Sequence, residues 1–119
     1  PDAVFVRIIQ EITGAAVDGQ RGPKTIEAVK RLQRRLGVKV DGVFGPGTAE
    51  AYLLSVPNLY KGRGGMSSGD VKLLQWIVRS RVDGKFGDLT VADVKSAQVW
   101  AGLTPDGNVG DETKKRITI

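Results

Sequence analysis

The chain of 119 residues contains no cysteine and no histidine. Without cysteine it can form no disulfide and offers no thiol nucleophile. Without histidine it can build neither a Ser-His-Asp triad nor a histidine-bearing zinc site. A pair of carboxylates for glycoside cleavage remains formally possible, but the aspartates of the repeats described below fall at turn positions and the glutamates on predicted helices or at a helix start. We therefore expect a non-catalytic chain that needs no cofactor and no metal.

Long apolar runs are missing too, and aromatic residues make up only 6% of the chain. No stretch approaches the roughly 20 apolar residues of a membrane span, so we expect no membrane partner. The chain begins at Pro1 rather than Met. We therefore expect it to be part of a larger protein, and we draw nothing from the lack of a targeting signal.

What the chain does contain is a loop repeated four times. Asp-Gly pairs begin at Asp18, Asp41, Asp83 and Asp106. Three residues after the glycine of each pair comes a second glycine, and three residues later a threonine. The pairs lie 23 residues apart within each half of the chain, and the halves repeat at an offset of 65 without a gap. Such fixed-period similarity indicates a tandem duplication of a small module that contains two copies of the loop.

Each loop has the features of a compact turn between two helices. Asp followed by Gly favours an Asx-turn and a residue with positive φ. The second glycine can cap the next helix, the threonine can return a hydrogen bond to the loop, and Phe44 and Phe86 are expected to plug the core. One aspartate per loop provides too few oxygen ligands for an EF-hand, and no copy has the Gly-Lys-Ser/Thr of a phosphate loop. We interpret the loops as scaffold rather than as ligand contacts.

Between the loops, the apolar spacing is helical. The four stripes are Val6, Ile9 and Gln10; Ile26, Val29, Leu32, Gln33 and Leu36; Val71, Leu74, Gln75 and Val78; and Val91, Val94, Ala97, Gln98 and Ala101. Short third helices are expected around Thr48–Leu54 and Thr113–Ile119. The sequence therefore predicts an all-α fold of two tandem three-helix modules, residues 1–54 and 69–119, joined by a linker at 55–68. The glutamines of the stripes are expected to tie each helix to the following loop by hydrogen bonds to the backbone.

The net charge of +5 favours anionic partners. Basic residues are spread almost evenly over the two halves. The densest cluster, within residues 30–35, interleaves with apolar residues, and its simplest interpretation is the solvated face of a helix. Because the aromatic residues do not interleave with the basic ones as stacking platforms would, we do not expect nucleic-acid binding.

The order of motifs resembles a known family. A helix with Leu-Gln, the loop Asp-Gly-x-Phe-Gly-Pro-x-Thr, a helix with Val-Lys-x-x-Gln and a second such loop are similar to the peptidoglycan-binding domain of the three-helix type. Residues 40–48 are the closest stretch and residues 82–87 the next. The resemblance covers residues 4–54 and 69–119 as two consecutive copies. In the first loop, Arg21 replaces the aromatic residue of the pattern.

The family is found on bacterial cell-wall hydrolases, phage endolysins and some transpeptidases. The resemblance therefore implies a non-catalytic module that binds peptidoglycan or an associated anionic wall polymer. It would target a lytic enzyme such as a phage endolysin to the bacterial wall, at its extracellular face, with the catalytic domain in the same parent chain. The alternative is a structural or protein-interaction module in which the same repeats form a rigid spacer.

A shallow sugar site commonly presents aromatic faces flanked by charged side chains. Because Trp76 points away from the stripe of Val71, Leu74 and Val78, it is expected to be exposed beside Arg79. We expect the wall contact to form from Trp76, Arg79 and Trp100, with Tyr60 of the linker and with charge from Arg31, Arg34 and Arg35. The other interpretation of the two tryptophans is packing between the modules.

Overall fold

The computed structural model describes residues 3–118, which form six α-helices and no regular strand. In chain order these are α1 (Ala3–Thr13), α2 (Pro23–Leu36), α3 (Pro46–Ser55), α4 (Ser68–Ile77), α5 (Asp88–Trp100) and α6 (Asp111–Ile117). The predicted all-α fold is confirmed. The last helix was expected to reach Ile119, which lies outside the described residues, but α6 ends at Ile117. Below, module 1 means α1–α3 and module 2 means α4–α6.

The four Asp-Gly loops have one conformation. The glycine of each pair has a φ of 76°, a value that favours glycine. Each aspartate accepts a hydrogen bond from the backbone N–H two residues later at 2.9–3.0 Å, as expected for an Asx-turn. The second glycine of each loop is the N-cap of the next helix. All three features were predicted, because each depends only on residues close in sequence.

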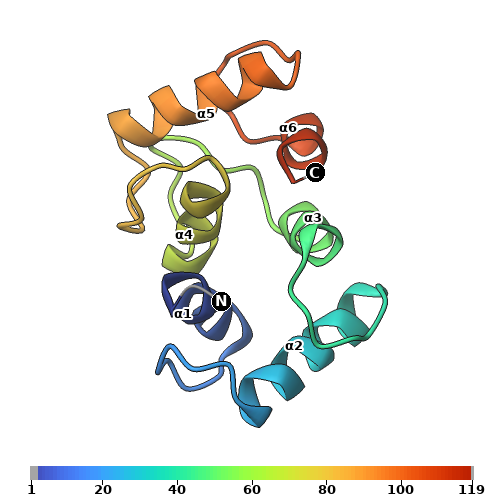
Figure 1. Cartoon of the computed structure of the whole chain (residues 1–119). Coiled ribbons are helices and arrows are strands. Elements are labelled where there is room, and N and C mark those ends of the chain that lie inside the picture. Colours follow the sequence, from blue (N-terminus) through green and yellow to red (C-terminus); the bar gives the residue numbers. More distant parts are fainter. Residues whose placement is uncertain (1–2, 119) are drawn as a thin grey trace.

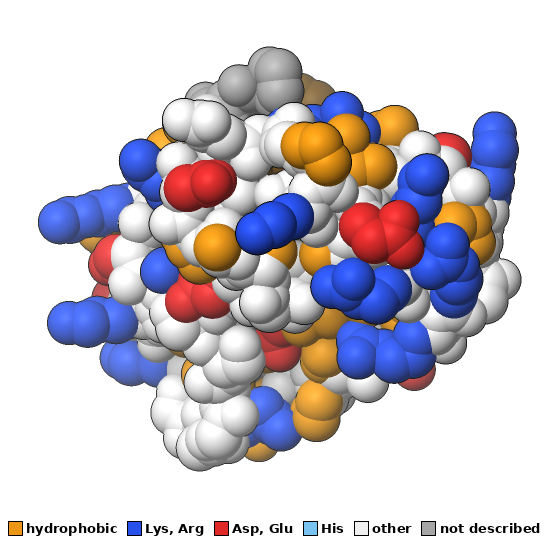
Figure 2. Space-filling model, turned by 90° about the horizontal axis from the view of Figure 1, so that it is seen from below, with side chains coloured by type: hydrophobic (Ala, Val, Ile, Leu, Met, Phe, Trp, Pro, Cys, Tyr) orange, Lys and Arg blue, Asp and Glu red, His pale blue; other side chains and the backbone are white. Residues whose placement is uncertain are grey.

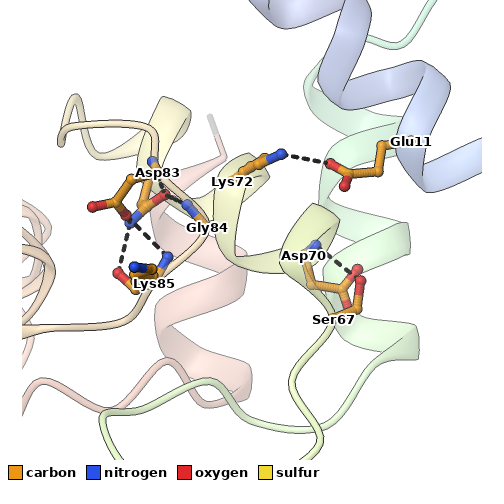
Figure 3. Close-up of polar contacts among 8 residues, drawn as sticks. Glu11, Ser67, Asp70, Lys72, Asp83, Gly84 and Lys85 are labelled. Atoms are coloured by element: carbon orange, nitrogen blue, oxygen red, sulfur yellow. Dashed lines mark hydrogen bonds and ion pairs between the residues drawn. The ribbon is translucent and has the colours of Figure 1, made fainter. Parts of the chain in front are cut away.

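A buried glutamine in the preceding helix organises each loop. Gln33 Oε1 accepts the backbone N–H groups of Asp41 and Gly42 at 3.0 and 2.9 Å. Its Nε2 lies 2.9 Å from Asp41 Oδ1, 3.0 Å from the carbonyl oxygen of Val43 and 3.0 Å from Thr48 Oγ1. The same arrangement surrounds Gln10 and Gln75. Gln98 makes the equivalent contacts with Gly107 and Thr113, but the N–H of Asp106 donates to the carbonyl of Thr104 instead. Figure 3 shows the loop of Asp83, Gly84 and Lys85, in which the aspartate accepts the N–H of Lys85. The prediction that the glutamines tie helix to loop is confirmed.

The two modules pack with like helices against each other. Helix α1 lies against α4, and α3 lies against α6, while α2 and α5 occupy opposite ends of the molecule (Figure 1). Exchanging the modules exchanges the members of each central pair. The duplication in sequence is therefore a pseudo-twofold arrangement in space.

One hydrophobic core serves both modules. Leu53 of module 1 and Leu73, Leu74 and Val94 of module 2 are fully buried within a single cluster. Phe44 and Phe86 are buried in it as well, as predicted for the loop phenylalanines. Units of roughly 50 residues bury a modest fraction of their surface and are marginally stable on their own. Sharing a core gives each module the apolar contacts that it lacks alone.

The segment between α3 and α4 takes part in this packing. Leu59 is 1% exposed and forms an isolated antiparallel bridge with Val109 in the fourth loop. Its N–H donates to the Val109 carbonyl at 3.2 Å, and its carbonyl accepts the Val109 N–H at 2.8 Å. Lys114 Nζ donates to the carbonyl of Val56 at 2.6 Å. Ser67 caps α4 by accepting the Asp70 N–H, as Figure 3 shows.

Candidate functional site

A cleft of about 320 Å³ lies where the four central helices meet. Phe5 of α1 and Ala49 of α3 line it from module 1, and Trp76 of α4 and Ile117 of α6 line it from module 2. Residues 44–46, at the start of α3, also line it. We call this space the aromatic cleft. Its position on the module interface means that neither half of the chain could form it alone.

Aromatic rings form one wall of the cleft. Phe5 stacks on Trp76 with ring centroids 5.4 Å apart and an interplanar angle of 28°. Phe5 also meets Phe44 edge to face at 6.2 Å. Trp76 is thus half-buried in the module interface, and the expectation that it projects freely into solvent is wrong. It points away from the stripe of its own helix, as predicted, but that direction leads to α1 of the other module.

Arg79 is the polar residue at the edge of the cleft. It follows α4 in a left-handed conformation with a φ of 60°, and it is the one non-glycine residue with positive φ in the described part of the chain. Its N–H donates to the carbonyl of Trp76 at 3.2 Å, which closes the end of the helix. The residue is exposed and contributes to the cleft lining. A guanidinium at the edge of an apolar cleft can recognise a carboxylate.

Trp100 lies on a neighbouring surface. At the end of α5 it is 92% exposed. It borders a shallow groove with Arg116, and this groove shares Ile77 and Ile117 with the aromatic cleft. The structure therefore brings Trp76, Arg79 and Trp100 to two adjoining surfaces, although only the first two line the cleft. A large apolar side chain left in water is the kind of feature that marks a contact site.

The other predicted site residues lie elsewhere. Tyr60 is exposed beside Lys61 and Lys95 on a separate surface. In module 1, Arg31 and Arg35 line a hollow between α1 and α2. Arg34 lies 3.4 Å from Glu27 on the same helix, and both side chains are exposed. These residues do not join the cleft.

The surface charge is dispersed rather than gathered. Figure 2 shows Lys and Arg side chains on both sides of the face seen from below, with Asp and Glu between them. One ion pair links the modules, between Lys72 Nζ and Glu11 at 3.2 Å, as drawn in Figure 3. In residues 3–118, no group of three or more potential ligand residues could hold a metal ion. None of the described helices is long and apolar enough to cross a membrane.

A buried polar cluster was missed by sequence reasoning. The Tyr52 hydroxyl donates to Asp70, and Lys114 lies near them with only 1% of its surface exposed. Burial raises the pKa of Asp70, with the Tyr52 hydrogen bond and the charge of Lys114 acting in the opposite direction. Burial also lowers the pKa of Lys114. Nothing in the helical spacing marked Asp70 as buried or distinguished Lys114 from a solvated lysine.

The comparisons with known proteins agree with this architecture. The model of the family described as "Putative peptidoglycan binding domain" matches residues 9–51 and 67–117, which together are more than half of the chain. The two matches correspond to the two modules, and proteins of such a family associate with the cell wall through a domain that is in general non-catalytic. No curated protein and no solved structure matches the chain significantly. Two family matches on two structurally equivalent modules show that the chain belongs to the peptidoglycan-binding-domain family, with two copies in tandem.

Proposed function

We propose that this chain is the wall-targeting part of a lytic enzyme, such as a phage endolysin, and that it holds a catalytic domain of the same parent chain on bacterial peptidoglycan. The observation that carries the proposal is the family match on both modules. A binding module joined to an enzyme raises the local concentration of that enzyme at its substrate. The site of action would be the wall, reached at its extracellular face or, for an endolysin, at lysis.

The aromatic cleft is the proposed principal contact. It combines apolar walls with a single positively charged residue, Arg79, as small-molecule and polymer sites commonly do. Trp100 would extend the contact along the adjoining groove. The arginines of α2, namely Arg31, Arg34 and Arg35, and Tyr60 with its neighbouring lysines would add weaker contacts with anionic wall polymers.

Co-sedimentation with purified sacculi tests the proposal. The protein is expected to pellet with sacculi at low salt and to retain part of that binding when salt rises to about 150 mM, because a Debye length near 8 Å screens dispersed surface charge more than contacts in a cleft. Absence of co-sedimentation at low salt would contradict the proposal. A stable complex with a protein partner in its place would favour the interaction-module alternative.

Two variants that lose the same charge distinguish binding in the cleft from general electrostatic attraction to the wall. Arg79→Ala and Arg34→Ala each remove one positive charge, the first at the cleft and the second from a pair exposed to solvent. Arg79→Ala is expected to weaken binding at both salt concentrations. Arg34→Ala is expected to have a small effect that disappears in salt. Equal effects of the two variants would mean that the cleft is not the contact.

A further inference from the structure

A groove of about 290 Å³ lies beside Trp100, where the three helices of module 2 end. Its lining consists of the last residues of the three helices and their neighbours, namely Ile77, Ala97, Trp100, Ala101, Arg116 and Ile117. We call it the Trp100 groove. Because all of these residues belong to one module, its shape does not depend on how the two modules face each other.

Two alanines leave the space in this groove. An offset of 65 residues relates the modules, and it places Ala97 and Ala101 at the positions of Leu32 and Leu36. In module 1, Leu32 is buried and Leu36 packs against the core. The hollow beside them measures about 220 Å³. The smaller side chains of module 2 therefore leave open a space that leucines fill in module 1.

Trp100 contributes little to the packing of the fold. Its side chain is 92% exposed, and the equivalent place in module 1 holds Arg35, which is exposed as well. Equivalent helices therefore form with or without an aromatic residue at this position. An exposed indole gains free energy when a ligand removes it from water. A widened groove beside such an indole, present in module 2 and not in module 1, is typical of a ligand contact.

The chain that connects the modules does not line this place in either of them. Residues 56–67 follow module 1 and precede module 2. None of them lines the hollow at Leu32 or the Trp100 groove. The segment runs instead beside the first half of α5, where Tyr60 and Lys61 lie near Val91. The path into module 2 and the path out of module 1 thus both avoid the equivalent surfaces.

We propose that the Trp100 groove binds a sugar ring of the peptidoglycan glycan strand, with the indole of Trp100 against the C–H face of the ring. The inference rests on the proposed function and names the glycan, rather than the stem peptide, as the ligand of this surface. A sugar ring has an apolar face and a polar edge. The groove matches it with an indole, four aliphatic side chains and one guanidinium, and none of its lining residues is acidic. The space at Ala97 and Ala101 takes the acetamido group that the sugars of peptidoglycan carry.

Arg116 provides the polar side of the groove. Its Nη1 lies 3.5 Å from the carbonyl oxygen of Ala101 at the end of α5, which positions the guanidinium beside Trp100. The remaining N–H groups of the guanidinium can donate to ring hydroxyls or to an acetamido carbonyl. The equivalent residue of module 1 is Ala51. The indole, the alanines and the arginine are thus all particular to module 2.

The size of the groove favours a sugar over a protein partner. Six residues line it, whereas a stable protein interface involves about 20–30 residues on each side. A volume of about 290 Å³ is near the lower end of the range for small-molecule sites. It therefore suits one or two sugar rings of a strand.

Fluorescence quenching tests the inference on the whole chain. Trp76 and Trp100 are its two tryptophans, so the emission of a Trp76→Phe variant reports Trp100 alone. The soluble probes are peptide-free glycan strands, a stem tetrapeptide and poly(glycerol phosphate). Glycan strands are expected to shift the emission of Trp100 to shorter wavelength and to reduce its quenching by acrylamide. The tetrapeptide and the polyphosphate are expected to leave both unchanged.

Matched substitutions in the parent chain place module 1 residues in module 2. Ala101→Leu fills the groove at a φ of −84°, which leucine adopts without strain, and Ala92→Leu makes the same change at an exposed position of α5 outside the groove. Trp100→Arg removes the indole, and Val99→Arg adds the same charge at the neighbouring exposed residue. Ala101→Leu and Trp100→Arg are expected to lower affinity for glycan strands by about tenfold or more, as the loss of a stacking contact implies. The two control variants are expected to bind as the parent does, and all four are expected to melt as it does.

The possible outcomes lead to different conclusions. If sacculi bind the protein but glycan strands do not protect Trp100, the inference is overturned and the proposed function stands. Protection by the stem tetrapeptide or by poly(glycerol phosphate) alone would also overturn it, because the ligand would then be a peptide or a polyanion. Equal losses in Trp100→Arg and Val99→Arg would attribute the effect to charge and remove the indole from the site. Failure to bind sacculi at all would count against the proposed function itself.

Discussion

The side chain of Gln33, in the last turn of α2, lies 3.0 Å from the hydroxyl of Thr48 in the first turn of α3. This contact joins two helices through the loop that separates them. Because Gln33 also holds two backbone N–H groups of the loop, one side chain fixes the path of the chain from helix to helix. The contact between the glutamine and the threonine recurs at all four loops. Each loop is therefore a small unit organised around one glutamine side chain.

Replacing this glutamine should destabilise the protein. Gln33→Ala leaves the buried N–H groups of Asp41 and Gly42 without their acceptor. Each buried group that loses its partner costs about 1–3 kcal/mol. A clear fall in melting temperature is expected. Gln20→Ala, an exposed glutamine on the first loop, should melt as the parent does. An unchanged melt for Gln33→Ala would contradict the arrangement of the loop.

The loop aspartates should make the fold sensitive to acid. The N–H of Val43, followed by the side chain of Gln33, lowers the pKa of Asp41 below its ordinary value of 3.8. A folded-state pKa below the unfolded one gives stability that is present above the unfolded value and is lost as the pH falls through the folded one. Asp18, Asp83 and Asp106 are shifted in the same direction, each first by the N–H donated two residues later.

Asp41→Asn tests this linkage. The amide oxygen can accept the same two hydrogen bonds, but it does not titrate. The variant should fold at neutral pH and lose stability less steeply between about pH 5 and pH 2. Melts across that range, on freshly purified protein, provide the comparison. If the variant lost stability with falling pH as steeply as the parent does, Asp41 would not contribute to the acid sensitivity of the fold.

Arg79 should be replaceable by glycine with no loss of stability. A non-glycine residue at positive φ is strained, commonly by about 1 kcal/mol or more, and the equivalent position of module 1 is Gly14, with a φ of 81°. Arg79→Gly is expected to melt at the same or a higher temperature while binding sacculi less well. Arg81→Gly changes the same residue type at a position without positive φ and should melt lower. A destabilised Arg79→Gly would mean that the arginine side chain has a structural role.

The two tryptophans should differ in their contribution to thermal stability. Trp76 stacks on Phe5 across the module interface, so Trp76→Ala removes buried contacts and should lower the melting temperature. Trp100 is almost fully exposed, so Trp100→Ala should leave the melt unchanged. If Trp100 stacks on the ligand, its loss should weaken sacculus binding by about 1–3 kcal/mol, the range for aromatic stacking on nucleic-acid bases. Binding equal to that of the parent would remove Trp100 from the site.

The features that sequence could predict are local. Helix spacing, the loop turns and the link from Gln33 to Asp41 all lie within short stretches of chain, and the repeats give four views of the same unit. The packing of α1 on α4 joins residues far apart in sequence, and the repeat pattern does not specify how one module faces the other. That is why the helix of Trp76 was described correctly and its surroundings were not.

The segment between the modules contains an apolar residue that could have indicated its packing against the core. Residues 55–68 were predicted to be a linker, and most of them are exposed. Leu59 is a large apolar residue within this mostly polar stretch, and burial of its side chain removes apolar surface from water. Only the three-dimensional structure shows that it pairs with Val109.

The shared core also has a mechanical consequence. Leu53 and Leu73 come from different modules and are both fully buried in the same cluster, so the modules cannot separate without partial unfolding. The pair therefore cannot reach two distant points of a wall mesh as two tethered arms would, and it gains no avidity from its own duplication.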